Sequence, residues 1–260
     1  MHSAMAAQRE KQQVQESIRL MRDGDAPCVV TISGFLNEER GRDEETTAWR
    51  RVPEVFPGRA WAHLYWMSQD RRTLMQRLGL AALCLLGPAG SLPFVGGLGM
   101  RLAMSAAAST RAASVWVDAL AHSRQAARSL HAALALGAHG EYVVLGHSLG
   151  GRVAFELLRL HAADPGAYAL AEVHLLGAAL GADPGKWDFL GASPATRIYN
   201  YYSRNDFVLR RLYKLGTLGS RAMGARPVGV PGVTDVDVTD LVGDHSEYMA
   251  RLDDILGREG

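Results

Sequence analysis

Ser148 stands between two glycines in the segment GHSLG, directly after the apolar run at 142–145. That run has the length and β-branched content of a buried strand, and residues 152–160 have the apolar spacing of a helix. The segment therefore predicts a sharp strand-to-helix turn with the serine at its apex. Gly146 and Gly150 lack the Cβ atoms that would block such a turn, so Ser148 can adopt a strained backbone conformation.

A serine hydroxyl is a poor nucleophile unless a base removes its proton, and the G-x-S-x-G elbow is followed along the chain by an acid and then a histidine. His161, His174 and His245 are the histidines that follow Ser148. His161 ends the predicted helix and His174 lies in an apolar run, so we interpret both as structural. His245, in a loop before an amphipathic segment, is the candidate base. His147 points away from the base if Ser148 points toward it.

The candidate acid is Asp206, because it directly follows the strand-like run at 197–203. Its alternative role is a helix N-cap, for which aspartate is favoured and the segment NDFVLRRLYKL suitable. Asp183, which follows the strand-like run at 171–177, is the reserve candidate.

Two backbone N–H groups are expected to form the oxyanion hole. Leu149 follows the nucleophile and supplies the first, and the segment after the strand at 28–33 supplies the second, from Phe35. This chemistry requires neither a metal nor an organic cofactor.

The composition fits one enzyme-sized domain. With 260 residues, 48% of them hydrophobic, residues 1–260 can bury a single sizeable core. The formal net charge of +1 argues against a nucleic-acid binder. Cys28 and Cys84 indicate neither a disulfide framework nor a zinc site. The polar N-terminus lacks a signal-peptide core, so we expect a cytoplasmic protein or one exported by a signal-free route.

Strand-like runs near 28–33, 60–66, 141–146, 171–177, 197–203 and 233–238 alternate with helix-length segments. This alternation predicts an α/β protein with a mainly parallel sheet covered by helices on both faces. We expect an N-terminal helix over 1–24 and a crossover helix over 114–136, with residues 70–113 as an insertion between strands.

The insertion contains an uncharged run at 78–100, which seven glycines and prolines break into pieces too short to span a membrane. It is expected to form a helical hairpin that serves as a cap or lid on the core. The alternative is a lid that also touches an anionic membrane surface, because residues 71–117 contain arginines and no acidic residue. A second basic stretch at 207–227 would complete a positive rim that attracts an anionic substrate.

The segments VVLGHSLGGRVAFELL, VHLLGA, RIYNYYSRNDFVLRRLYK and VDVTDLVGDHSEYMARLDDIL resemble the α/β-hydrolase family of the eukaryotic transmembrane and coiled-coil domain proteins, a former family of unknown function. The resemblance covers roughly residues 28–256. It implies an α/β-hydrolase fold similar to serine lipases and esterases, with Ser148 as nucleophile, Asp206 as acid and His245 as base. The long membrane-spanning and coiled extensions of eukaryotic members have no counterpart here, so membrane residence is not transferred.

The sequence thus predicts a serine carboxylic-ester hydrolase acting on lipid-like acyl esters. A thioesterase or acyltransferase would use the same three side chains. A non-catalytic membrane- or partner-binding protein on a hydrolase scaffold is the alternative outside enzymes, because a fold does not fix a function.

Overall fold

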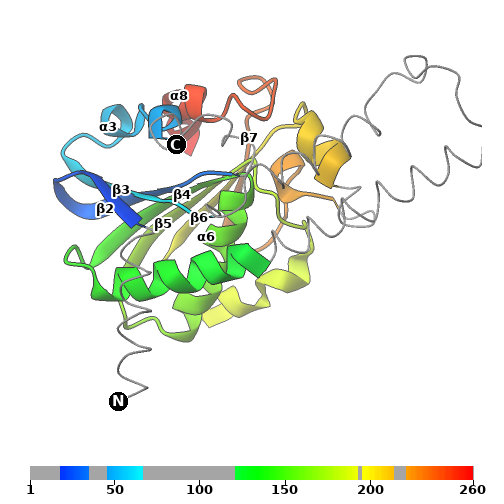
Figure 1. Cartoon of the computed structure of the whole chain (residues 1–260). Coiled ribbons are helices and arrows are strands. Elements are labelled where there is room, and N and C mark those ends of the chain that lie inside the picture. Colours follow the sequence, from blue (N-terminus) through cyan, green and yellow to red (C-terminus); the bar gives the residue numbers. More distant parts are fainter. Residues whose placement is uncertain (1–17, 35–45, 67–120, 193–194, 214–220, 260) are drawn as a thin grey trace, which may run out of the picture.

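The computed structural model describes residues 18–34, 46–66, 121–192, 195–213 and 221–259. Its centre is a seven-stranded sheet with the order β1-β3-β2-β4-β5-β6-β7 (Figure 1). The strands are β1 (Ile18–Arg22), β2 (Asp25–Ile32), β3 (Arg59–Leu64), β4 (Glu141–His147), β5 (Ala169–Leu176), β6 (Arg197–Tyr202) and β7 (Val233–Asp237). From β3 to β7 all neighbouring strands are parallel. The six expected strands and the mainly parallel sheet are confirmed, and the chain has an α/β-hydrolase fold.

The N-terminal part of the sheet corrects one expectation. Residues 18–22 form β1, which pairs antiparallel with β3, so the prediction of a helix there is wrong. Pairing with β1 satisfies the free edge of β3, and this tertiary gain outweighs the local helical preference of IRLMR. The rest of the expected N-terminal helix, residues 1–17, lies outside the described residues.

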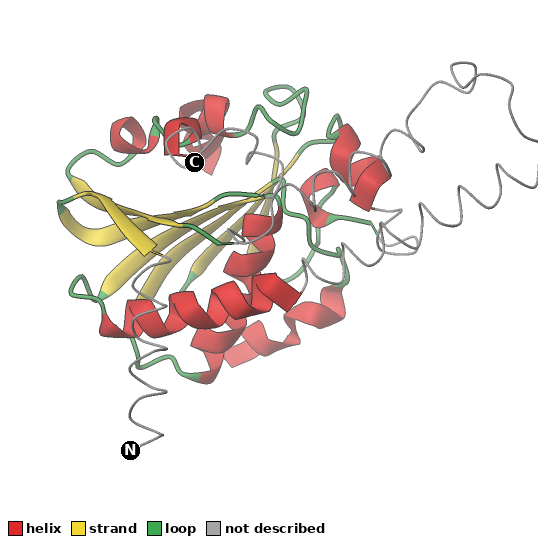
Figure 2. Cartoon of the chain, in the orientation of Figure 1, coloured by secondary structure: helices red, strands yellow, loops and turns green. Residues whose placement is uncertain are grey.

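Helices cover both faces of the sheet (Figure 2). A long helix over residues 121–136 and α6 (Leu149–Ala163) pack on one face, while the short helices α3 (Val52–Val55) and α8 (Leu252–Leu256) pack on the other. Short 3-10 segments are η2 (Pro184–Ala192), η4 (Met223–Ala225), η5 (Met249–Arg251) and η6 (Gly257–Glu259), and η3 (Val208–Tyr213) is a π-helix. The expected crossover helix is confirmed over residues 121–136.

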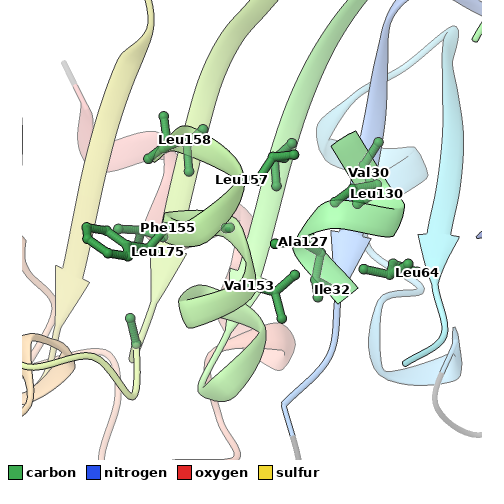
Figure 3. Close-up of a cluster of buried hydrophobic side chains, with 14 of the residues drawn as sticks. Val30, Ile32, Leu64, Ala127, Leu130, Val153, Phe155, Leu157, Leu158 and Leu175 are labelled. Atoms are coloured by element: carbon green, nitrogen blue, oxygen red, sulfur yellow. The ribbon is translucent and has the colours of Figure 1, made fainter. Parts of the chain in front are cut away.

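The larger apolar core lies between the sheet and its two long helices (Figure 3). Its labelled side chains come from β2, β3, β5, α6 and the helix at 121–136 and include Val30, Ile32, Leu64, Ala127, Leu130, Val153, Leu157 and Leu175. All of these except Ala127 are aliphatic chains of the size that contributes about 1.5 to 3 kcal/mol each when buried. This core fixes α6 against the strand that delivers the serine.

The opposite face of the sheet buries polar side chains that find partners within it. Thr31 accepts a hydrogen bond from the Trp61 indole N–H (2.9 Å) and lies 2.7 Å from His63 Nδ1. The Trp49 indole N–H donates to Ser33 Oγ (2.9 Å) at the end of β2. Because these groups are paired, their burial beneath α3 and α8 is tolerated.

The insertion expected at residues 70–113 lies outside the described residues, as does its uncharged run at 78–100. None of the helices in the described ranges is long and apolar enough to cross a membrane.

Gly150 is a position where the backbone of a neighbouring strand leaves no room for a side chain. A Cβ atom there would lie 2.1 Å from the Ile32 carbonyl oxygen, so Gly150→Ala must push α6 away from β2. We expect this substitution to lower the free energy of unfolding by about 1 to 3 kcal/mol or more. Urea denaturation of the full chain measures it, with Gly166→Ala as control, because nothing lies within 4 Å of a Cβ at Gly166. Equal stability of the two variants would contradict this account of the packing.

Candidate active site

Ser148 occupies the turn between β4 and α6 in a strained backbone conformation. Its φ is 55° and its ψ −119°, and it is the sole non-glycine residue with positive φ in the described ranges. Two hydrogen bonds hold the turn: Ser148 N–H donates to the Leu176 carbonyl (3.0 Å), and Ala179 N–H donates to the Ser148 carbonyl (2.9 Å). Such strain costs of order 1 to 3 kcal/mol, so it persists only where surrounding contacts enforce it. The predicted elbow is therefore present.

His245 approaches Ser148 from the loop between β7 and η5. Its Nε2 lies 2.9 Å from Ser148 Oγ, and its side chain is nearly fully buried. The loop is held from both ends: Ser203 Oγ donates to the Val242 carbonyl (2.6 Å), and Gly243 N–H donates to Glu247 Oε2 (2.8 Å). These bonds fix the backbone that presents the imidazole.

Asp206 lies four residues beyond the last residue of β6, and its side chain is fully buried. Its Oδ2 is 2.6 Å from His245 Nδ1, and its Oδ1 accepts the N–H of Leu209 (2.9 Å). With a carboxylate on Nδ1, that nitrogen carries the proton, so Nε2 is left as the acceptor for the serine hydroxyl. Asp206 therefore makes both of the contacts considered for it. One carboxylate oxygen lies beside the His245 ring, and the other caps the turn that follows.

The other candidates are kept away from this hydrogen-bond chain. Asp183 is exposed and its Oδ1 accepts the N–H of Gly185 (3.1 Å). His161 stacks on Tyr168 with ring centroids 5.0 Å apart. His174 lies 3.0 Å from Glu172 Oε2, and this contact is the main cause that lowers the pKa of Glu172 to about 2. Both histidines are structural, as expected.

His147 has a role that the sequence reasoning missed. It does not contact Ser148 Oγ as a base; its Nε2 lies 2.9 Å from the backbone carbonyl of His245. Since a carbonyl only accepts, Nε2 must carry a proton and donate it. Burial, and secondarily the neighbouring His245, hold the pKa of His147 well below its usual range, so the ring is neutral. The residue before Ser148 thus ties the end of β4 to the backbone of His245.

Tyr248 completes the packing around the two histidines. Its fully buried ring lies 5.6 Å from the His147 ring centroid, and its hydroxyl donates to the Gly224 carbonyl (3.3 Å). Its position in the segment DHSEYM, three residues after His245, is the one signal in the sequence that could have indicated this contact.

Of the two N–H groups proposed for the oxyanion hole, that of Leu149 lies in the described part of the chain. Leu149 is the first residue of α6, and the first N–H groups of a helix have no carbonyl partner inside it. Phe35 lies outside the described residues, but the preceding Gly34 borders the nucleophile: a Cβ atom there would lie 2.5 Å from Ser148 Cβ. The end of β2 therefore reaches the serine only because residue 34 has no side chain.

No group of three or more His, Cys, Asp or Glu side chains in the described part of the chain is arranged to hold a metal ion.

Two solved structures match this chain at low sequence identity and with TM-scores below 0.5. An esterase from Pyrobaculum calidifontis is 12% identical, with a TM-score of 0.40 over 98% of this chain and 94% of that one. Est816, described as an enzyme that degrades N-acyl homoserine lactones, is 10% identical, with a TM-score of 0.45 over 94% and 96% of the two chains. Similarities this distant do not identify an activity for this chain.

Sequence relatives are longer proteins. The transmembrane and coiled-coil domain-containing protein STS1 of rice (Oryza sativa) is 35% identical over 55% of this chain and 22% of its own length. An uncharacterised membrane protein of Schizosaccharomyces pombe is 30% identical over 90% of this chain and 42% of its own. The chain thus matches less than half the length of these relatives. The family described as "Protein of unknown function (DUF726)" matches residues 101–259, well over half of the sequence, and the chain belongs to this family.

Proposed function

We propose that this chain is a serine hydrolase that cleaves carboxylic esters through an acyl-serine intermediate. The observation that carries the proposal is the continuous chain of short contacts from Ser148 Oγ to His245 Nε2 (2.9 Å) and from His245 Nδ1 to Asp206 Oδ2 (2.6 Å). An isolated structural histidine would not need a strained serine on one side and a buried carboxylate on the other.

In the proposed reaction Ser148 Oγ attacks the acyl carbon while His245 Nε2 takes the hydroxyl proton. Asp206 keeps Nδ1 protonated and stabilises the imidazolium that forms. Backbone N–H groups of Leu149 and Phe35 stabilise the oxyanion, and His245 returns the proton to the leaving alkoxide. Water, activated in turn by His245, then releases the acid and restores Ser148.

Lipid-like acyl esters are the substrates that we favour. The support comes from the sequence, in which residues 78–100 carry no charge and residues 71–117 no acidic side chain. Relatives named as membrane proteins are compatible with a protein that works at a membrane surface. We therefore also propose peripheral contact with an anionic membrane.

The first test of the proposal is covalent labelling of the full chain with a fluorophosphonate probe. We expect one site of labelling at Ser148, because only a hydroxyl with a base in hydrogen-bond reach reacts at neutral pH. Ser148→Ala should abolish the label and all measurable turnover of short-chain activated esters. If the variant labels as strongly as the wild type, Ser148 is not the nucleophile.

The identity of the acid is tested by exchanging single carboxylates for amides. Asp206→Asn should lower kcat by about 10⁴-fold, because the amide N–H favours the wrong histidine tautomer, whereas His245→Ala should cost about 10⁶-fold. Asp183→Asn is the matched control and should leave kcat within about twofold. An active Asp206→Asn beside an inactive Asp183→Asn would transfer the role to Asp183.

The contact of His147 with the His245 backbone predicts a graded effect on turnover. His147→Phe removes the donor and should lower kcat by about 10- to 100-fold, since small displacements of a catalytic group have effects of this size. His147→Gln places an amide N–H near the position of Nε2 and should recover part of the loss. Thermal unfolding of both variants distinguishes a misplaced His245 from an unfolded protein. Equal kcat values for His147→Phe and His147→Gln would show that the hydrogen bond does not position His245.

A further inference from the structure

Arg152 is a buried arginine in the first helical turn after the nucleophile. It is 8% exposed, and its Nε has no hydrogen-bond partner in the described part of the chain. It lies in α6 four residues after Ser148, so its Cα is about 6 Å along the helix axis from the serine. A guanidinium group stays protonated in proteins, and a buried donor without a partner is costly. The position therefore needs an acceptor that the described residues do not supply.

The nearest carboxylate only partly compensates for Arg152. Glu156 Oε1 lies 3.8 Å from Arg152 Nη2, but Glu156 is closer to two exposed arginines, Arg159 (3.0 Å) and Arg124 (3.5 Å). Three guanidinium groups therefore share one carboxylate, and the buried one has the longest contact. Desolvation by burial lowers the pKa of Arg152, which shows that its charge is held at a cost.

Two further donors lie at the same end of the sheet. A Cβ atom on Gly181 would lie 2.6 Å from Lys186 Nζ and 3.4 Å from the Tyr213 hydroxyl, so both groups converge on this glycine. Arg152 and Tyr213 are close enough that each affects the pKa of the other. Burial raises the pKa of Tyr213 to about 12, so its hydroxyl stays protonated.

These donors come from segments that adjoin Ser148. Gly181 follows β5 in the loop whose Ala179 N–H binds the Ser148 carbonyl. Asp188, the acidic residue of the adjoining η2 segment, is exposed, and Asp183 Oδ1 accepts the N–H of Gly185.

We propose that Arg152, Lys186 and Tyr213 form a subsite for an anionic group, of the phosphate type, on the ester substrate. The anion would accept hydrogen bonds from the Arg152 Nε–H and the Lys186 ammonium, and charge-assisted bonds of this kind are about twice as strong as neutral ones. This inference rests on the proposed function, since it places the ester carbonyl at Ser148 and the anion one helical turn away.

The test compares two substrates that differ by one phosphate, 1-butyrylglycerol and 1-butyrylglycerol 3-phosphate. Selectivity, the ratio of kcat/KM for the phosphate ester to that for the neutral ester, should favour the phosphate ester in the wild-type chain. It should fall about 10-fold in Arg152→Gln and about 3- to 10-fold in Lys186→Gln. Arg128→Gln, which removes the same charge from an exposed arginine on the helix at 121–136, should leave the selectivity unchanged.

The exposed Lys186 keeps the proposal testable if Arg152→Gln fails to fold. Repeating the comparison with the oleoyl pair separates two sources of the anion: a larger selectivity with oleoyl chains indicates a lipid headgroup, and selectivity confined to the butyryl pair indicates a small soluble ester. Unchanged selectivity in folded Lys186→Gln overturns the subsite, while Ser148-dependent hydrolysis of 1-butyrylglycerol still supports the proposed function.

If neither ester is turned over, the proposed function fails and the subsite is tested by itself. Calorimetric titration of the full chain with inorganic phosphate should then show binding that weakens about 3- to 10-fold in Lys186→Gln and weakens as salt is added. Binding that is equal in wild type and Lys186→Gln overturns the subsite.

Discussion

The positive-φ turn at Ser148 is the constraint on which the other features of this structure depend. A residue with a side chain is held at φ 55° only if its neighbours leave space for the turn and its backbone groups are engaged. Gly34 and Gly150 leave that space, because a Cβ on either would collide with Ser148 or with the carbonyl of Ile32. Leu176 and Ala179, at the end of β5 and just beyond it, engage the backbone of Ser148. The strain is thus stabilised by two adjacent strands and not by the turn itself.

Parallel pairing then brings the remaining groups to the same edge of the sheet. Asp206 follows β6 and His245 comes after β7, so both arrive at the end of the sheet where β4 delivers Ser148. The three residues are separated by 39 and 97 positions along the chain, yet two contacts of 2.6 and 2.9 Å join them. Short-range sequence patterns do not determine contacts between residues so far apart in the chain. The strand order, together with the hydrogen bonds that Ser203 and Glu247 make to the loop of His245, brings the three side chains together.

Local patterns in the sequence are sufficient to predict six of the seven strands and to propose Ser148, His245 and Asp206, since each lies in a turn or loop that follows a strand-like run. They are insufficient where tertiary contacts determine the secondary structure of a segment or the partner of a side chain. IRLMR has no strong strand pattern, and it becomes β1 because β3 offers a free edge. For Asp206 the acid and the N-cap were treated as alternatives, although a carboxylate has two oxygens and the structure uses one for each contact. The bond of His147 to the His245 carbonyl depends on the path of a loop that no local pattern in the sequence describes.

The neutrality of His147 matters for the proposed reaction. The ring centroids of His147 and His245 are 4.8 Å apart, so a positive charge on His147 would oppose the imidazolium that His245 becomes when it accepts the serine proton. Burial keeps His147 uncharged, and its Nε2–H is directed at a carbonyl of the base's own backbone. The unpaired Nδ1 of His147 is a cost of this arrangement, because a buried acceptor is left without a donor in the described part of the chain. A buried, uncharged side chain thus holds the backbone of His245, and Asp206 is the carboxylate in hydrogen-bond contact with its ring.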